Sequence, residues 1–318
     1  MSAIAGHTIQ VQTPGLLTTV QDLGRDGLGP IGVSPSGAAD PIALRLGNRL
    51  VANAESAAGL EMTLTGGTFV FPEGAIVALT GSDFGATLDG AAVEMWTSTE
   101  VRPGQALCLG ATRSGARCYL CVRGGIEVTP FLDSASTHLL TGLGGFEGRA
   151  LRKGDVLHIG PAASSFGKRS IAPQAAQHFS LRNVLRFTAG PQADWFSEAS
   201  MRSFCESSFR VGEQSNRMGL RLEGAPVPPT SGRQMTTEGV SLGAIQVPPG
   251  GLPIILFIDQ QTTGGYPKIG NVISADLHRL GQLRPRDEIR FERVTFEAAR
   301  SLLVEQERAL RSGELLAE

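Results

Sequence analysis

A dense run of polar side chains follows an apolar segment in the last third of the chain. Ile254–Ile258 is rich in residues that suit a pleated surface and predicts a buried strand. Asp259–Lys268 follows at once, with five consecutive polar side chains and then two glycines. A rigid strand end holds hydrogen-bonding groups in place, and glycine lets a backbone approach a ligand closely. We expect a site for a small polar molecule here, with an ordinary polar loop as the alternative; the expected substrate-binding residues are Gln261, Thr262, Thr263, Gly264, Tyr266 and Lys268.

Two carboxylates near this run are the expected acid–base residues. Glu238 precedes the apolar segment and Asp259 ends it. A side chain that transfers a proton must lie within hydrogen-bond reach of the reacting group. For either carboxylate the alternative role is a structural hydrogen bond to loop backbone. Glu238 closes a polar segment that also contains Arg233, Thr236 and Thr237.

A second candidate set lies in a glycine-punctuated segment near the N-terminus. Asp22 and Arg25 precede Ser36 and Gly37. A guanidinium can fork onto a carboxylate, and a carboxylate can accept from an amide N–H, so this set is expected to orient an amide or carboxylate substrate. An internal salt bridge is the alternative. The neighbouring Asp40 is expected to cap a helix.

The periodicity predicts which elements position these residues. Asp40-Pro41 is a helix start, and the apolar spacing continues to about Val51. Short β-type runs separated by turns fill the stretch from about residue 60 to residue 160. Further helices are predicted at three places: from Gly190-Pro191 through Phe204, over Ile273–Leu283, and over Thr295–Ser312 with Phe296, Ala299, Leu303 and Leu310 on its buried face.

A weak internal repeat also favours β structure in both halves of the chain. The segments that begin at Arg102, Arg152 and Arg284 each combine a turn with a following apolar run. Turn-and-strand units of this kind commonly close sheets and barrels. The 41 glycines and 18 prolines in 318 residues agree with many tight turns. Composition and periodicity thus predict a β-rich α+β fold.

Length and composition limit the classes of function. The chain is long enough for two domains, which we place at residues 1–165 and 180–318 on either side of an aperiodic linker over 162–179, with strand exchange between the halves as a further possibility. A formal net charge of −2 predicts no nucleic-acid or membrane partner. The sequence shows no apolar membrane span or signal peptide, and its four cysteines show no disulfide framework, so a cytoplasmic location is expected.

Several chemistries lack their signatures in the sequence. Gly167-Lys168 is followed by Arg169 in place of Ser or Thr, so it is no nucleotide-phosphate loop. Cys118 and Cys121 fall on opposite faces of a predicted strand, and the histidines lack ligand spacing, so no metal site is expected. No biotin-carrier motif is present. A reaction that needs ATP or biotin would therefore require another polypeptide.

Three long motifs resemble the allophanate hydrolase subunit 2 family, also called the KipA or PxpC family. They are QVPPGGLPIILFIDQQTTGGYPKIGNVISADL, TVQDLGRDGLGPIGVSPSGAADPIALRLGNRLV and GGFEGRALRKGD, at Gln246–Leu277, Thr19–Val51 and Gly144–Asp155. The resemblance covers most of the chain and implies a cyclophilin-like β-barrel arrangement with two subdomains. Asp26 departs from the family pattern, which commonly has proline there.

The resemblance implies a role as one subunit of a larger enzyme. The main expectation is an ATP-dependent 5-oxoprolinase, a hydrolase that opens the lactam of 5-oxoproline to L-glutamate. Its implied partners are a KipI-like (PxpB-like, subunit 1) protein and a PxpA-like third component. ATP with Mg²⁺ would bind through the partners, and this chain alone would hold no cofactor.

Two alternatives remain open. One is the carboxyltransferase subunit of a biotin-dependent urea or amide carboxylase, in which biotin would be required. The other is a non-catalytic, KipA-like regulator that binds a KipI-like kinase inhibitor. Turnover of 5-oxoproline, carboxybiotin-dependent carboxylation, and binding without turnover would distinguish the three.

Overall fold

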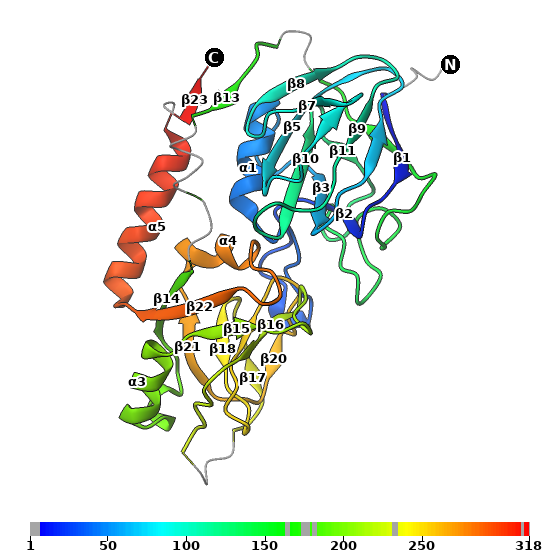
Figure 1. The fold of residues 1–318 in the computed structure, drawn as a ribbon. Coiled ribbons are helices and arrows are strands. Elements are labelled where there is room, and N and C mark those ends of the chain that lie inside the picture. The colour runs from blue at the N-terminus through cyan, green and yellow to red at the C-terminus, as the bar shows by residue number, and fades with distance from the viewer. Residues whose placement is uncertain are drawn as a thin grey trace. The chain divides into compact units, whose positions relative to one another are not determined.

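The structure, a computed structural model, describes residues 7–162, 166–172, 179, 183–230, 235–312 and 315–317. The chain divides into two compact units. Unit 1 contains Met1–Arg25, Ser36–Phe179 and Gly313–Glu318, and unit 2 contains Asp26–Pro35 and Ser180–Ser312. Both units are rich in strands, and unit 2 contains a closed barrel, so the predicted β-rich α+β fold with a β-barrel arrangement is confirmed (Figure 1).

Unit 1 is built from two antiparallel sheets and one long helix. The seven-stranded sheet has the order β11 (Ile126–Glu127), β12 (Val156–Ile159), β1 (Thr8–Thr13), β4 (Thr68–Val70), β9 (Ala106–Cys108), β6 (Thr87–Leu88) and β7 (Ala91–Ala92). The five-stranded sheet has the order β2 (Leu17–Gln21), β3 (Gly59–Thr63), β10 (Arg117–Val122), β5 (Ala75–Gly81) and β8 (Ser98–Val101). The helix is α1 (Pro41–Leu50), and a small separate sheet pairs β13 (Ser170–Ile171) with β23 (Leu316–Ala317).

Strand β10 shows why both faces of the five-stranded sheet are apolar. All six of its residues are buried. Cys118 belongs to the hydrophobic core shared with the seven-stranded sheet, whereas the Cys121 thiol points toward the carbonyl of Leu44 in α1. The two thiols therefore lie on opposite faces, as the three-residue spacing predicts. Figure 1 shows α1 beside β5 and β10. The helix packs closely there because Gly47 has no side chain: a Cβ would lie 2.6 Å from the Cys121 Sγ atom.

Unit 2 is organised around a closed seven-stranded barrel. Around the barrel the strands are β14 (Val184–Ala189), β21 (Lys268–Val272), β18 (Ala244–Gln246), β19 (Ile254–Leu256), β16 (Gly219–Glu223), β15 (Phe209–Val211) and β22 (Glu288–Arg293). A short hairpin-like pair, β17 (Glu238–Gly239) and β20 (Thr263–Gly264), lies outside the barrel. The other elements of unit 2 are η1 (Gly29–Ile31), η2 (Ala193–Trp195), α3 (Glu198–Glu206), η3 (Ser274–Asp276), α4 (Leu277–Leu280) and α5 (Phe296–Arg311).

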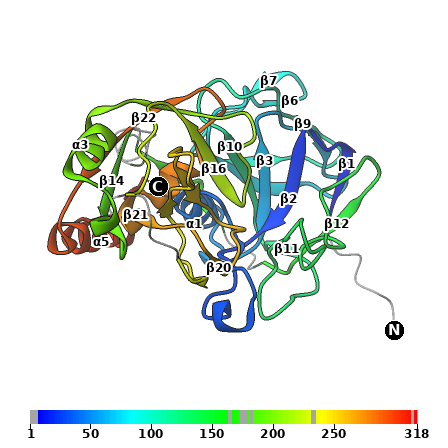
Figure 2. The ribbon, with the colours of Figure 1, turned by 90° about the horizontal axis from the view of Figure 1, so that it is seen from below.

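Alternation along the barrel strands separates an apolar inside from a more polar outside. Leu220 and Leu222 of β16 are buried, whereas Arg221 between them is exposed. Aromatic rings fill part of the interior. Phe204 of α3 stacks on Phe291 of β22 with ring centroids 4.3 Å apart. Figure 2 shows α3 beside β22, so this helix covers the barrel through Phe204.

The internal repeat corresponds to three turns of the same design. In Arg102–Gln105, Arg152–Asp155 and Arg284–Asp287, the N–H of the fourth residue donates to the carbonyl of the first. In each turn the side chain of the fourth residue also accepts from the N–H of the first, at 2.7–2.8 Å. The third residue has a positive φ in all three, and in the last turn it is Arg286 in place of glycine. Each turn starts a strand, so this prediction is confirmed.

Three local predictions need correction. The helix expected from Gly190-Pro191 begins only at Glu198, after the η2 turn, because Ser197 caps it by accepting from the N–H of Ser200. Strand β19 ends at Leu256, because the chain turns there: the N–H of Gln260 donates to the carbonyl of Phe257. Phe296, expected on the buried face of α5, is 68% exposed because it occupies the first position of that helix.

The remaining sequence-based expectations concern the linker and the membrane. The expected linker over 162–179 lies only partly within the described residues, and β13 is found there. Within the part of the chain that the structure describes, no helix is both long enough and apolar enough to span a bilayer.

His278 in α4 predicts how stability depends on pH. Burial lowers the pKa of His278 from 6.5 to about 4, and the adjacent Arg279 guanidinium acts in the same direction. Between these two values the unfolded chain binds a proton that the folded chain excludes, so this contribution is complete above pH 6.5 and is lost as the pH falls toward 4. We expect His278 alone to reduce the free energy of unfolding by about 2.5 kcal/mol between pH 7 and 4.5.

Urea unfolding followed by tryptophan fluorescence at several pH values tests this expectation. His278→Gln should flatten the pH dependence in that interval. His158→Gln is the control, because His158 lies on an exposed position of β12 and its loss should leave the profile unchanged. Identical pH profiles for His278→Gln and the parent chain would contradict the assignment.

Candidate functional site in the barrel

The polar run after β19 folds back over the outer face of the barrel. Its residues Thr263 and Gly264 form β20, which pairs with Glu238 and Gly239 of β17. The N–H of Val240 extends this pairing by donating to the carbonyl of Thr262 at 3.0 Å. Two segments that the sequence separates by more than twenty residues are therefore adjacent, and Glu238 lies beside the predicted binding run.

A charged pair closes one side of this region. The ammonium of Lys268 forms an ion pair with Glu238, and the Gln192 side chain donates to the same carboxylate oxygen at 2.9 Å. Lys268 is almost fully buried, whereas the Glu238 side chain is 44% exposed. The Lys268 ammonium, followed by Gln192, lowers the pKa of Glu238 below its usual value. Glu238 is thus ionised at neutral pH, and it can hold Lys268 in place and accept hydrogen bonds.

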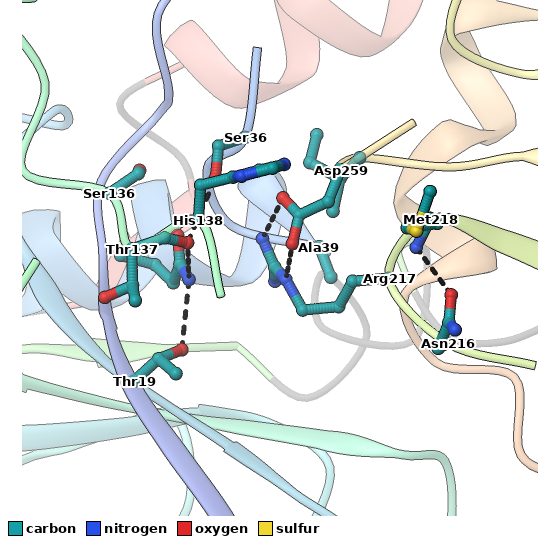
Figure 3. A network of polar contacts seen from close by, with 12 residues as sticks. Thr19, Ser36, Ala39, Ser136, Thr137, His138, Asn216, Arg217, Met218 and Asp259 are labelled. Carbon is teal, nitrogen blue, oxygen red and sulfur yellow. Dashed lines mark hydrogen bonds and ion pairs between the residues drawn. The ribbon is translucent and has the colours of Figure 1, made fainter. Parts of the chain in front are cut away.

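Asp259, the second expected acid–base residue, is held by an arginine. The guanidinium of Arg217 donates from Nε to Oδ2 at 2.7 Å and from Nη2 to Oδ1 at 3.0 Å, as Figure 3 shows. Both side chains are buried, at 6% and 4% exposure. The backbone repeats the connection, since the N–H of Asp259 donates to the carbonyl of Arg217. This bidentate pair fixes the start of the polar run, so the geometry favours a positioning role for Asp259; its catalytic role stays a prediction.

Gln261 and Tyr266 line a pocket of about 360 Å³ on the outer face of the barrel. The floor comes from strands β16, β18 and β19, and the other lining residues are Asn216, Met218, Gly219, Arg221, Gln246, Pro248, Ile254 and Leu256. The side chain of Asn216 accepts from the N–H of Met218 at 2.8 Å and so shapes the chain at the edge of the pocket (Figure 3). A concave site that combines an apolar floor with a few polar groups suits a small polar ligand.

Gln246 and Arg221 are pocket residues that sequence reasoning missed. Gln246 is only 1% exposed, and its Nε2 atom has no hydrogen-bond partner among the described residues. A β-bulge lies beside it, because the register between β18 and β21 shifts at Ile245 and Gln246. Bulges of this kind redirect side chains next to functional sites. The only sequence signal was the position of Gln246 just before the Pro248-Pro249 turn; Arg221 resembles any polar residue of an alternating strand.

The N-terminal candidates form a separate cluster within unit 1. The carboxylate of Asp22 accepts from the hydroxyl groups of Ser134 and Ser136 and from the backbone N–H groups of Gly24 and Ala135. Asp22 therefore holds the loop around Ser134–Ser136 against the end of β2. These hydrogen bonds give the buried Asp22 carboxylate a structural role. A role of Asp22 in substrate binding stays a prediction.

Arg25, Ser36 and Gly37 contact the same loop or its surroundings. Arg25 donates to the carbonyl of Ser136 at 2.6 Å and lies over the ring of Phe131. The hydroxyl of Ser36 donates to the carbonyl of Thr137 at 3.1 Å. Gly37 has φ +103°, and a Cβ there would lie 2.9 Å from the backbone of Leu23 and Gly24, so only glycine fits. The sequence did not indicate the loop residues, although the run Asp133-Ser134-Ala135-Ser136-Thr137 is dense in hydroxyls.

Asp40 has the predicted capping role. Its Oδ1 atom accepts from the N–H of Ala43 at 3.0 Å at the start of α1. The Tyr119 hydroxyl connects this helix start to a buried carboxylate, because it accepts from the N–H of Asp40 and donates to Glu61, both at 2.7 Å. Burial, followed by the charges of Glu61 and Asp40, raises the pKa of Tyr119 well above its ordinary value. Tyr119 thus stays protonated and serves as a structural donor.

No metal site accompanies these clusters in the described ranges. No group of three or more His, Cys, Asp or Glu side chains in these ranges is arranged to hold a metal ion. Arg233, which belongs to the polar segment before Glu238, lies outside the described residues. The groups available for chemistry are therefore carboxylates, amides, hydroxyls and the cations of Lys268 and Arg221.

Comparisons with known proteins define the family to which the chain and its fold belong. Residues 31–293 match the family described as carboxyltransferase domain, subdomain A and B. The chain belongs to this family. Its fold is similar to that of the K. lactis urea amidolyase crystal structure, with a TM-score of 0.89 and 32% sequence identity over 98% of this chain and 20% of that one.

Two similar relatives match along nearly their whole length. The C-subunit of 5-oxoprolinase from Escherichia coli is 39% identical over 300 residues, which cover 94% of this chain and 96% of the relative. The corresponding 5-oxoprolinase C-subunit of Haemophilus influenzae is 38% identical over 284 residues, which cover 89% and 90%. The urea amidolyase, in contrast, is about five times as long as the part that this chain matches.

The buried pair in the barrel predicts a large effect on stability. Asp259→Ala leaves the Arg217 guanidinium buried without its bidentate acceptor, and breaking a buried pair in this way costs about 3–5 kcal/mol. We expect the free energy of unfolding, measured in urea, to fall by that amount. Glu223→Ala is the matched control: the Glu223–Arg210 pair at 2.8 Å is half exposed, and its loss should cost less than about 1 kcal/mol.

The double variant Arg217→Met/Asp259→Leu separates the contribution of the two charges to stability from the contribution of the volume that the two side chains fill. It removes both charges and replaces them with apolar groups, so most of the lost stability should return. If Asp259→Ala unfolds at the same urea concentration as the parent chain, the pair does not hold the polar run in place.

Proposed function

We propose that this chain is a subunit of an ATP-dependent 5-oxoprolinase, which opens the lactam of 5-oxoproline to L-glutamate together with partner subunits. The observation that carries the proposal is the match to the 5-oxoprolinase C-subunit over at least 89% of both chains in two organisms. A match of this extent indicates a chain of the same domain content. The word "subunit" in both relatives' names supports a multi-subunit enzyme.

The pocket supports this chemistry from the side of the substrate. 5-Oxoproline is a small, flat ring that carries a lactam and a carboxylate. Binding it requires donors to the lactam carbonyl, acceptors for the lactam N–H, and a cation near the carboxylate. Gln261 and Tyr266 line the pocket and supply an amide and a hydroxyl, and the apolar floor suits the ring.

We assign the chemical roles in the barrel as follows. Glu238 is the proposed acid–base group, since its ionised carboxylate is exposed to solvent and held at a fixed place by Lys268 and Gln192. Its lowered pKa makes Glu238 a weak base. Glu238 therefore serves best by accepting a hydrogen bond from the group that loses a proton during the reaction. Asp259 positions the polar run through Arg217. Thr262, Thr263 and Gly264 supply the backbone that connects Gln261 and Tyr266 of the pocket and that runs beside Glu238.

The partners and cofactors complete the proposal. A KipI-like (subunit 1) protein and a PxpA-like component are the proposed partners, and ATP with Mg²⁺ is proposed to bind through them. ATP would act as a co-substrate whose γ-phosphoryl group activates the lactam carbonyl oxygen. Water would then add to the activated carbon and the C–N bond would break, so that 5-oxoproline, ATP and two waters give L-glutamate, ADP and phosphate. In the described part of this chain the polar groups of the pocket can bind and orient the lactam. We also propose a cytoplasmic location.

A second candidate function follows from the family. The matched family is a carboxyltransferase domain, and the urea amidolyase structure shares the fold over nearly all of this chain. A chain of this kind could move a carboxyl group from carboxybiotin to an amide nitrogen, with biotin supplied by another polypeptide. Urea, unlike 5-oxoproline, has no carboxylate, so the two functions place different demands on the pocket. A regulator that only binds its KipI-like partner is the third candidate.

Glutamate release from 5-oxoproline with ATP tests the proposal. The assay compares this chain alone, its co-encoded partners alone, and the complete mixture. We expect glutamate only from the complete mixture. Absence of glutamate from a mixture that assembles into one complex, as shown by size-exclusion chromatography, would reject the 5-oxoprolinase function; carboxylation of urea with carboxybiotin would then be assayed.

Glu238→Gln tests the assigned acid–base group in the same assay. The variant keeps the shape of the side chain but removes the charge beside Lys268, so we expect at least a tenfold lower kcat. Because Glu238→Gln leaves the almost fully buried Lys268 ammonium without its carboxylate, we expect the free energy of unfolding to fall as well, so the rate is compared at a temperature at which the variant is fully folded. Glu223→Gln, which removes a similarly exposed partner of Arg210, should keep its rate within twofold. Unchanged kcat in Glu238→Gln would show that Glu238 has no part in the reaction.

A further inference from the structure

The strand register places four side chains in one row on the outer face of the barrel. Ile254 of β19 pairs with Arg221 of β16 on one side and with Gln246 of β18 on the other, and Gln246 pairs in turn with Lys268 of β21. Paired residues of neighbouring strands point to the same face of a sheet. The row therefore runs Arg221, Ile254, Gln246, Lys268. With strands about 4.8 Å apart, the Cα atoms of Arg221 and Gln246 are separated by about 10 Å.

Gln246 lies on the floor of the pocket with an unused donor. It is 1% exposed, and no described residue accepts a hydrogen bond from its Nε2 atom. Buried polar side-chain atoms are nearly always hydrogen-bonded, so this one calls for an explanation. The run after β19 makes room for the amide: a Cβ on Gly264 would overlap the Gln246 Nε2 atom. The Nε2 atom is packed against Gly264, so a ligand carbonyl reaches this unused donor when the Gln246 amide turns toward the pocket that it lines.

Arg221 supplies a cation at the other end of the row. Arg221 is exposed and lines the same pocket. Across the ranges that the structure describes, no carboxylate lies within 4.0 Å of its guanidinium, whereas Arg210 on the adjacent strand is paired with Glu223 at 2.8 Å. A planar guanidinium forks onto a carboxylate with two parallel hydrogen bonds. Arg221 can therefore receive a carboxylate that comes from a ligand.

The space between these two groups suits a small ring. Ile254 separates them on the floor, and Leu256 continues the apolar surface. Tyr266, with 45% of its surface exposed, offers a ring at the edge of the pocket. The pocket volume of about 360 Å³ lies at the lower end of the range for small-molecule sites. A ligand that spans the row would have a carboxylate on one side of an apolar ring and a carbonyl on the other.

We propose that this outer-face pocket binds a small molecule that carries both a carboxylate and a planar amide, with the carboxylate on Arg221 and the amide carbonyl on the Nε2 atom of Gln246. Arg221 and Gln246 are then the residues that determine specificity. The inference rests on the proposed function to the extent that 5-oxoproline has both groups. It also predicts discrimination: 2-pyrrolidinone has the lactam without the carboxylate, and urea has the amide alone.

Binding measurements without turnover test the pocket separately from the enzyme activity. Isothermal titration of 5-oxoproline, 2-pyrrolidinone and urea into the chain, and into its complex with the partner subunits, needs no ATP. We expect 5-oxoproline to bind at least tenfold more tightly than either analogue. If 5-oxoproline binds in the titration but the complete mixture with ATP releases no glutamate, the pocket is kept and the proposed reaction is rejected.

Two substitutions test the individual contacts. Arg221→Gln should weaken the binding of 5-oxoproline at least tenfold and leave the affinity for 2-pyrrolidinone unchanged. Arg290→Gln is the control, because Arg290 is an exposed arginine of barrel strand β22 that does not line the pocket. Gln246→Leu should weaken the binding of both ligands at least tenfold. Since the lost donor has no described partner in the chain, the melting temperature of Gln246→Leu should stay equal or rise, which separates a binding role from a structural one.

A glycine substitution can move the amide without removing it, and its neighbour provides a control. Gly264→Ala pushes the Gln246 side chain aside and should weaken the binding of 5-oxoproline at least fivefold. Gly265→Ala is the matched control, since its Cβ would make only an ordinary contact, 3.4 Å from the Thr237 hydroxyl. The proposal is overturned if 5-oxoproline binds neither the chain nor the complex, or if Arg221→Gln and Gln246→Leu bind it as the parent does. It is also overturned if urea binds more tightly than 5-oxoproline.

Discussion

The closed hydrogen-bond ladder of the barrel is the constraint on which the site depends. Because every strand of the barrel is paired on both sides, a shift of one strand would move its apolar residues from the inside to the outside. The register is therefore fixed, and with it the outer row that contains Arg221, Ile254, Gln246 and Lys268. The bulge beside Gln246 is the one local departure among these pairings, and it lies where the row meets Lys268. A rigid scaffold thus presents a cation, an apolar surface and an amide at set spacings.

Buried carboxylates hold the irregular segments in both units. In unit 2, Asp259 fixes the polar run by its bidentate pair with Arg217. In unit 1, Asp22 collects hydroxyl and backbone donors from the loop around Ser134, and Glu61 connects the start of α1 to β10 through Tyr119. A buried charge is costly unless it is fully hydrogen-bonded, so each of these carboxylates forces its loop into one arrangement. Each unit thus has irregular segments that a buried carboxylate holds in place without regular secondary structure.

The same framework occurs in proteins with different names. The 5-oxoprolinase C-subunit and urea amidolyase both match this chain over most of its length, although the second is a much longer protein. A shared core explains the common fold, whereas function depends on the groups that the core presents. On the barrel of this chain those groups include a cation without a described carboxylate partner and a buried amide, which under our proposal would distinguish a lactam acid from urea by charge. The outer face of the barrel, more than the fold, is the place to look for the choice of substrate.

Local sequence determined the elements whose causes are local. Asp40-Pro41 starts α1, the three Arg-led segments form the same turn, and the polar run after Ile258 marks the candidate region, because capping, turn geometry and strand patterns act within a few residues. The family motifs predicted the fold class for the same chain. Only the tertiary structure showed that Asp259 pairs with Arg217, that Glu238 lies beside Thr263, and that Gln246 is buried with a donor that no described residue uses. These facts depend on strand pairing between segments far apart in the sequence, and no short-range pattern encodes the partner of a strand.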